Sequence, residues 1–402
     1  MPSTDSTSSP ADIRRAALRF VLLISVLSFF ADFTYEGARS ITGPYLETLR
    51  ASAFIVGTVA GLGELCGYAL RFFSGRLADI TGRFWPITIF GYTVQMISVP
   101  ALALTGSWQA AAVLIVLERV GRAIRNPPRD VMLSHAAKHV GGYGWTFGVH
   151  EACDQFGALC GPLVIAVVLA HGGKYHEAFA VLLVPALITL GFVGIARLLY
   201  PKPQDLEPAF TDSGPPTPYS RAFWVYLVGA ALVAIGFADY SLIAYHFARE
   251  HSVSSALIPI FYAVAMAVSG GASLLFGRLF DRYGFPVLVG LTIVASLFAP
   301  LVFLGGFWMA LLGAAVWGMG MGVHESIIPA AVTPMVLPQR RASAFGLFTA
   351  SYGIFWFLGS ALMGFLYERS LMAVIVFCMS TQLMAVPLFL WVSGSRARPS
   401  QA

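Results

Sequence analysis

Twelve long apolar runs constrain the fold of this chain more than any other feature of its sequence. Each run is about 20 residues long, the length that an α-helix needs to cross the hydrocarbon core of a bilayer. They begin near Ala16, Ala53, Trp85, Trp108, Gly144, Glu177, Ala222, Ala256, Phe285, Phe307, Ala342 and Met372. The sequence therefore predicts an all-α membrane protein with twelve transmembrane helices, surrounded by the lipid bilayer.

Composition and charge support this class and argue against a nucleic-acid partner. Of the 402 residues, 57% are hydrophobic and 11% are charged, whereas about a quarter of the residues of a soluble protein are charged. If the helices alternate in direction, most basic residues near the ends of the runs fall on one side. The exceptions are Arg50, Lys174, Arg249 and Arg369. The positive-inside rule then places both termini in the cytoplasm and the chain in the cell (inner) membrane.

The chain is duplicated. Residues 75–83, Gly-Arg-Leu-Ala-Asp-Ile-Thr-Gly-Arg, return in weaker form at residues 277–284. An acidic residue inside the first run, Asp32, has a counterpart in the seventh run, Asp239. A repeat between the first and seventh helices preserves direction through the membrane, as in transporters built from two parallel halves. We predict two pseudo-symmetric bundles of six helices.

The repeated segment carries a family resemblance. Its pattern, Gly-x-Leu-x-Asp-x-x-Gly-Arg between the second and third runs, resembles the signature loop of the major facilitator superfamily of transporters. The resemblance implies the major facilitator fold, transport by alternating access, and no enzymatic activity. It also implies a conformational latch made of Gly75, Asp79, Gly82, Arg83, Gly277, Asp281 and Gly284. The alternative is that these residues end a helix and anchor it by positive charge.

Composition along the chain predicts the domain boundaries. The segments are a cytoplasmic tail at 1–14, an N-terminal bundle at 15–200, a cytoplasmic linker at 201–221, a C-terminal bundle at 222–393 and a second cytoplasmic tail at 394–402. The linker is polar and rich in proline, which favours an extended chain. The two bundles are therefore expected to move as separate bodies within a monomer.

The fifth run contains Gly157, Gly161 and Pro162, which resemble a glycine-rich signature of the exchangers in this superfamily. Glycines four residues apart let another helix approach closely, and an internal proline permits a bend. We predict a hinge here, with static tight packing as the alternative. In the fourth run, Arg119 loosely matches the arginine of the family's Arg-x-x-Gln-Gly element, although Arg122 replaces the glutamine.

The fourth run ends in a cluster of arginines and prolines. Pro127 and Pro128 are expected to stop the helix, because proline lacks a backbone N–H and restricts the preceding residue. Arg125 and Arg129 flank the prolines. We interpret both arginines as cytoplasmic anchors whose side chains reach the membrane surface.

Charged residues inside the runs carry the functional argument. Eight are acids, Asp32, Glu36, Glu64, Glu118, Glu151, Asp154, Asp239 and Glu325; four are bases, Arg39, Arg71, Arg119 and Arg122. Each would cost roughly 2.5 to 3.5 kcal/mol at the centre of a lipid-facing helix, so they must line a wet cavity or pair with one another. The excess of acids predicts that protons or a cationic substrate complete the cavity.

Helical spacing predicts which of these charges share a face. The sets are Asp32, Glu36 and Arg39; Glu64 and Arg71; Glu118 and Arg122; His150 and Asp154; Asp239 and His246. Some of them could be permanent ion pairs that set helix packing.

The main hypothesis is proton-coupled export of a small cationic or amphiphilic molecule. Asp32, Glu36, Arg119 and Asp239 are the predicted proton-coupling residues. The predicted substrate cleft contains Glu64, Glu118, Arg122, His150, Glu151, Asp154, His246, His324, Glu325, Tyr35 and Trp356. Uptake by proton symport needs the same buried acids and remains an alternative. A receptor or assembly factor that reuses the scaffold is a rival from another class.

The segment His150-Glu151-Ala152-Cys153-Asp154 allows two further readings. His150 and Asp154 lie one helical turn apart and could bind a divalent metal, which makes a metal exporter an alternative. The segment also resembles the His-Glu-x-x-His motif of zinc hydrolases, but Asp154 stands where the second histidine would be. We therefore predict ordinary cleft residues, with no resident metal and no cofactor.

Overall fold

The computed structural model describes residues 10–137, 140, 143–201, 219–328, 331, 332, 335, 336 and 341–397. The regular elements of this described part are all helices, which confirms the predicted all-α class. Eleven helical segments within it are long and apolar enough to cross a membrane. The fourth span falls outside this set because its helix carries several arginines and acids, yet it lies among the other spans, as part of a twelve-pass bundle.

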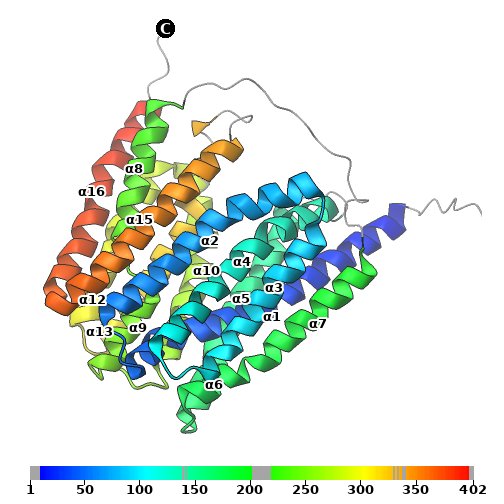
Figure 1. Ribbon diagram of the computed structural model, residues 1–402. Coiled ribbons are helices and arrows are strands. Elements are labelled where there is room, and N and C mark those ends of the chain that lie inside the picture. The colour runs from blue at the N-terminus through cyan, green and yellow to red at the C-terminus, as the bar shows by residue number, and fades with distance from the viewer. Residues whose placement is uncertain are drawn as a thin grey trace, which may run out of the picture.

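The N-terminal bundle has six passes, which lie side by side in Figure 1. They are formed by α1 (Pro10–Thr48), α2 (Ala53–Thr81), α3 (Phe84–Ala101) with η1 (Leu102–Leu104), α4 (Trp108–Ala137), α5 (Tyr143–Ala170), and α6 (Tyr175–Val181) with α7 (Leu183–Leu199). The last two helices make one pass, broken near Leu182.

The C-terminal bundle repeats this arrangement. Its passes are α8 (Arg221–Ile235) with α9 (Tyr240–Arg249), α10 (Ile258–Tyr283), α11 (Phe285–Ser296) with α12 (Phe298–Leu304), α13 (Phe307–Gly322) with η3 (Val323–Ile327), α15 (Arg341–Arg369) and α16 (Leu371–Ala397). The predicted linker lies largely outside the described residues, as do most of the two tails.

Helix contacts confirm the predicted pseudo-symmetry. In the N-terminal bundle α1 packs on α5 and α7, while α2 packs on α4; in the C-terminal bundle α8 packs on α15 and α16, while α10 packs on α13. Each pair in one half thus has its counterpart in the other. Between the halves, α2 contacts α15 and α5 contacts α10, again as symmetric counterparts, and α1 contacts α9.

The repeated sequence motif ends a helix in both halves. Gly82 caps α2 with φ 62°, and its N–H donates to the Ala78 carbonyl. Gly284 caps α10 with φ 70°, and its N–H donates to the Phe280 carbonyl. Positive φ favours glycine over residues that carry a Cβ. The last glycine of each copy is therefore explained by helix termination alone.

The double proline does not stop the fourth helix, contrary to our prediction. α4 continues through Pro127 and Pro128 to Ala137. Pro127 has no N–H to donate to the Ala123 carbonyl, but the Ser74 hydroxyl of α2 donates to it instead, at 3.0 Å. A neighbouring side chain that satisfies the freed carbonyl is the usual way in which a membrane helix tolerates proline. α4 therefore presents arginines along a longer face than we predicted.

The seventh pass is broken in the middle. α8 ends at Ile235, and α9 begins after Asp239, whose carboxylate accepts a hydrogen bond from the Ser241 N–H at 2.9 Å. The carbonyl groups freed by the break are also satisfied. Trp317 donates to the Ala238 carbonyl at 2.8 Å, and Gln382 donates to that of Gly236. The break places the Asp239 carboxylate at a helix start, facing the other bundle.

Glycines bring the bundles together on the side opposite the chain termini. A Cβ built on Gly57 of α2 would lie 2.2 Å from the Ser360 carbonyl oxygen of α15, and one on Gly43 of α1 would lie 2.0 Å from the Ser241 carbonyl oxygen of α9. No side chain fits at such distances, so the backbones are in direct contact. In Figure 1 the bundles converge at the lower end and spread toward the upper end, where α8, α16 and the start of α1 lie.

Candidate functional site

A cavity of about 710 Å³ lies between the bundles. It extends toward the side of the termini, because its lining includes Asn126, Arg129 and Asp130 in the later part of α4. The wall from the N-terminal bundle is charged. The wall from the C-terminal bundle is formed by Met266, Ser273, Met321, His324, Glu325, Phe348, Thr349 and Tyr352. The cavity therefore has one highly charged wall and one mostly apolar and aromatic wall.

The cavity is close to charge balance. Six arginines line it, Arg39, Arg71, Arg119, Arg122, Arg125 and Arg129. Seven acids line it, Asp32, Glu36, Glu64, Asp130, Glu151, Asp154 and Glu325. The large excess of acids that we predicted is not found there, because Arg125 and Arg129 face the cavity instead of the membrane surface.

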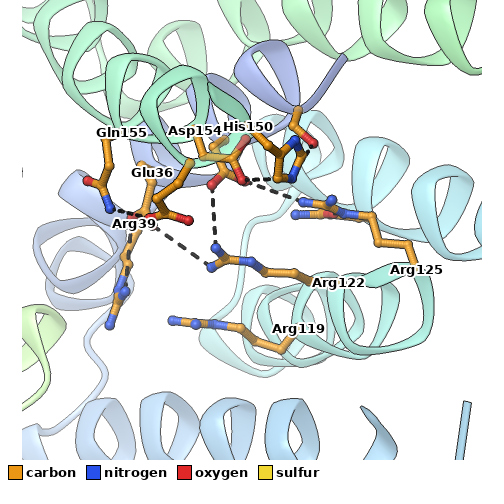
Figure 2. A network of polar contacts seen from close by, with 12 residues as sticks. Glu36, Arg39, Arg119, Arg122, Arg125, His150, Asp154 and Gln155 are labelled. Atoms are coloured by element: carbon orange, nitrogen blue, oxygen red, sulfur yellow. Dashed lines mark hydrogen bonds and ion pairs between the residues drawn. The ribbon is translucent and has the colours of Figure 1, made fainter. Parts of the chain in front are cut away.

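The charged wall is organised as a continuous network that begins at Asp32. Asp32 of α1 is paired with two arginines of α4, at 3.3 Å from Arg125 and 3.5 Å from Arg122. Figure 2 shows Arg119, Arg122 and Arg125 entering the network from this one helix. Arg122 also lies 3.9 Å from Glu36, so it joins two carboxylates of α1.

Arg39 extends the network to α2 and to the other bundle. Its guanidinium lies 3.9 Å from Glu36, 3.4 Å from Glu64 and 3.0 Å from Asp239. Arg39 and Asp239 are both buried, and Asp239 belongs to the C-terminal bundle. A second link between bundles is the hydrogen bond that the Tyr262 hydroxyl donates to Glu36. Both links lie at the deep end of the cavity.

The network closes on itself through Gln95. Arg119 lies 2.7 Å from Glu64 and 3.6 Å from Glu118. The Gln95 amide donates to Glu118, and its carbonyl accepts a hydrogen bond from Arg125 at 2.6 Å. Arg125 leads back to Asp32. The N-terminal bundle thus supplies a ring of four carboxylates and four arginines that is formally neutral.

Asp239 is the fifth carboxylate of this network and the one contributed by the C-terminal bundle. It gives the network one negative charge in excess, because Arg39, Arg119, Arg122 and Arg125 balance only Asp32, Glu36, Glu64 and Glu118.

Comparison with known proteins identifies the family. The sequence model of the Major Facilitator Superfamily matches residues 22–359 and 227–401. The chain belongs to the major facilitator superfamily. It is therefore a multi-pass membrane protein and a secondary transporter that acts on a small-molecule substrate.

Relatives and solved structures agree with this membership. A Mycobacterium tuberculosis protein is 38% identical over 391 residues, which cover 96% of this chain and 95% of that one. An MFS-type transporter of Methanocaldococcus jannaschii is 24% identical over 360 residues, covering 87% and 89%. The crystal structure of the nucleoside transporter NupG matches with a TM-score of 0.71 at 16% identity, over 94% of this chain and 98% of NupG.

A bacterial homologue of the human lysosomal transporter Spinster, solved in an inward-facing and unoccupied conformation, matches with a TM-score of 0.69 at 17% identity. The match covers 96% of this chain and 99% of that one. At these identities the structural likenesses show the major facilitator fold and no more.

Three pairs of residues that share a helix face by spacing do not form ion pairs with each other. Glu64 pairs with Arg119 and Arg39, not with Arg71. Glu118 pairs with Arg119 and accepts from Gln95, not from Arg122. In each case a partner on a neighbouring helix, or the next residue along the chain, lies closer than the one at helical spacing.

The third of these pairs is Asp239 and His246. The break before α9 turns Asp239 toward Arg39, while the His246 ring contacts the Tyr367 hydroxyl at 2.9 Å and packs on Phe303. His246 does not line the cavity that we describe. Trp356 is likewise buried against Phe237 and His324, outside that lining.

The remaining predicted cleft residues lie in or beside the cavity. His150, Glu151, Asp154, His324 and Glu325 line it. Tyr35 lies under the network, with the guanidinium carbons of Arg122 and Arg119 at 4.1 and 4.8 Å from its ring centroid. Tyr35 and Glu118 line a small adjoining pocket of about 20 Å³.

His150 and Asp154 form the pair that helical spacing predicted, at 3.5 Å. The Ser28 hydroxyl lies 3.5 Å from the same histidine nitrogen. Within the described residues, no group of three or more His, Cys, Asp or Glu side chains is placed to hold a metal ion.

Arg125 and Arg129 are buried and do not reach the membrane surface as the anchors that we predicted. Arg125 is fully buried and donates to Gln95, Tyr92 and Asp32. Arg129 donates to Ser28 at 3.1 Å and pairs with Asp130 at 2.7 Å. Their spacing from Arg122, at three and seven residues, places them on the same helix face as the predicted cleft residues and is the signal for this position.

The latch and the hinge that the family motifs imply both stay predictions. The side chains of Asp79 and Asp281 lie outside the described residues, and Arg83 is exposed, so the latch is not tested. Gly157 and Gly161 of α5 lie directly against the α1 backbone, where an added Cβ would meet the carbonyl oxygens of Phe29 and Phe33 at 2.3 and 2.2 Å. These contacts are within one bundle.

Proposed function

We propose that this transporter couples proton entry to the export of a small organic molecule, and that Asp239 is the carboxylate whose protonation changes between transport states. The termini and the open side of the cavity would face the cytoplasm, in agreement with the positive-inside distribution. The observation that carries the proposal is the ion pair between Arg39 and Asp239, which joins the two bundles at 3.0 Å.

Rocking of the two bundles would change the partners of Asp239 but not those of Arg39 within its own bundle. In alternating access, opening the far side separates α1 from α9. Arg39 keeps Glu36 and Glu64 as partners within its own bundle. Asp239 keeps the Ser241 N–H but loses its arginine. A carboxylate without a counter-charge in a poorly solvated site favours its protonated form.

Because Asp239 has its arginine partner in only one of the two states, it binds a proton in one state and releases it in the other. Asp239 takes a proton while the far side is open and releases it when Arg39 returns. Asp32 and Glu36 support the same step, because protonation of either would weaken the arginine ring that holds Arg39 in place. Export by antiport is favoured over uptake by the resemblance of Gly157, Gly161 and Pro162 to the exchanger signature.

The test uses inverted membrane vesicles whose interior has been acidified. Compounds are first chosen by growth of a drug-sensitive bacterial host, with and without expression of the protein. For an exported compound, addition to the vesicles should dissipate the pH gradient, and Asp239→Asn should abolish this dissipation. Substrate exchange between two equal pools, which needs no proton, should persist in Asp239→Asn.

The control is Arg282→Gln, which removes an exposed basic residue at the end of α10. It should leave dissipation unchanged. If Asp239→Asn dissipates the gradient as well as the parent protein, the proton-coupling proposal fails. If substrate is instead accumulated with the proton, the direction is uptake by symport.

A further inference from the structure

Most charges that line the cavity already have partners. Arg39, Arg119, Arg122, Arg125 and Arg129 each lie within 4.0 Å of a carboxylate. Asp32, Glu36, Glu64 and Asp130 each lie near an arginine, and Asp154 lies near His150. These side chains pair with one another within the N-terminal wall and leave few charges for a ligand.

Three lining charges have no ion pair within the described part of the chain: Arg71, Glu151 and Glu325. Arg71 lies over the Tyr68 ring, 5.5 Å from its centroid. Glu151 accepts one hydrogen bond from the Gln155 amide at 2.9 Å. All three residues are exposed, because the cavity is open to solvent around them.

The three lie at one depth. Arg71 is 18 residues from the far-side start of α2, and Glu325 is 18 residues from that of α13. Glu151 is 19 residues from the far-side end of α5. At 1.5 Å per helical residue, each is about 28 Å from the far side. They therefore form a layer across the cavity.

Arg71 and Glu151 lie on opposite sides of this layer. Arg71 stands at the contact between α2 and α15, where the Tyr68 and Tyr352 rings are 5.8 Å apart. Glu151 stands at the contact between α5 and α10, since its partner Gln155 lies beside Gly270 of α10. η3, which carries Glu325, also packs on α10. The two contacts are the symmetric counterparts that flank the cavity.

Between these sides the C-terminal wall is apolar. Met266, Met321 and Phe348 line it there. Flexible thioethers adapt to ligands of different shape, and apolar lining with few charged groups at fixed points is the usual form of a small-molecule site.

We infer that the cavity binds an amphoteric organic molecule, with an anionic group at Arg71, a cationic group at Glu151 and Glu325, and an apolar body against Met266, Met321 and Phe348. The inference rests on the proposed transport function only in taking this cavity as the substrate site. It narrows the substrate class from a cationic molecule to one that carries both charges.

The experiment measures binding to the purified protein by the shift of its melting midpoint, without any pH gradient. Two matched sets of probes are used. One is 6-aminohexanoate, hexylamine and hexanoate; the other is 4-(aminomethyl)benzoate, benzylamine and benzoate. Each set presents one apolar body with both charges, with the cation alone or with the anion alone. The doubly charged member should bind about tenfold more tightly than either partner, a difference of roughly 1.4 kcal/mol.

Variants assign each charge to its residue. Arg71→Gln should remove the advantage of the carboxylate, so that the doubly charged probe binds no better than the amine. The double variant Glu151→Gln, Glu325→Gln should make it bind no better than the acid. Arg76→Gln, an exposed arginine on the same helix α2 but outside the cavity lining, should change nothing.

Two results would overturn the inference. One is that a singly charged probe binds as tightly as the doubly charged probe in both sets. The other is that neither doubly charged probe shifts the midpoint at millimolar concentration. Asp239→Asn should leave the charge preference intact, so failure of proton coupling and failure of this site are distinguishable.

Discussion

At the scale of single residues, Arg125 contributes most to holding the charged ring together. It is fully buried and donates to Asp32, Gln95 and Tyr92 from three different nitrogens. Replacing it leaves three buried polar groups short of a partner, and removing one member of a buried ion pair costs about 3 kcal/mol or more.

We therefore expect Arg125→Met to lower the melting midpoint of the detergent-solubilised protein strongly and to reduce the folded yield. Arg76→Gln, in which the arginine is exposed, should melt like the parent protein. Equal midpoints for Arg125→Met and the parent would show that the ring is not a stabilising structure.

The sequence identified many members of the site but few of their partners. Spacing placed Asp32, Glu36 and Arg39 on one face of α1, and they do face the network. Helical periodicity, however, fixes which residues share a face of one helix and not which helices meet. The partners of Glu64 and Asp239 come from other helices, so no pattern within α2 or α9 could show them.

At the scale of helices, α2 and α15 close the far side by backbone contact. Gly57 is the tightest point of this contact, with the Ser360 carbonyl oxygen 2.2 Å from the position of an added Cβ. A larger residue can be accommodated only if the two helices separate, which is the movement that opens the far side.

We expect Gly57→Leu to favour the far-side-open state. A reporter cysteine at Thr42, which is buried in α1 near this closure, should then react with a membrane-impermeant maleimide added outside the cell. Gly271→Leu is the control, since an added Cβ there meets nothing within 4 Å. Equal labelling in Gly57→Leu and the control would mean that the contact does not gate access.

Helix number and symmetry followed from the sequence, whereas helix breaks did not. Apolar run length and the duplicated motif determine twelve passes in two halves. The continuation of α4 through Pro127 depends on the Ser74 hydroxyl of another helix, and the break before α9 depends on Trp317 and Gln382. Such tertiary hydrogen bonds override local preference, although Asp239 two residues before Ser241 is a usable signal for a helix start.

At the scale of the whole molecule, the proposed proton coupling depends on one carboxylate. Asp239 would lie beside Arg39 in one transport state and away from it in the other. The two bundles form a cavity open toward the termini and meet at the far side through Arg39 with Asp239 and Glu36 with Tyr262. On the proposed mechanism, lowering the pH should protonate Asp239, remove its attraction for Arg39 and so favour separation at the far side. The sign follows from the pair alone, because only the ionised carboxylate attracts the guanidinium.

The most direct test measures this conformational equilibrium against pH. Spin labels are placed at Thr48→Cys and Met372→Cys, exposed positions at the far-side ends of the two bundles, in a background without Cys66, Cys153, Cys160 and Cys378. The account predicts that the distance between the labels lengthens as the pH falls, and that in Asp239→Asn it is long at every pH. A pH response in Asp239→Asn equal to that of the parent would contradict it.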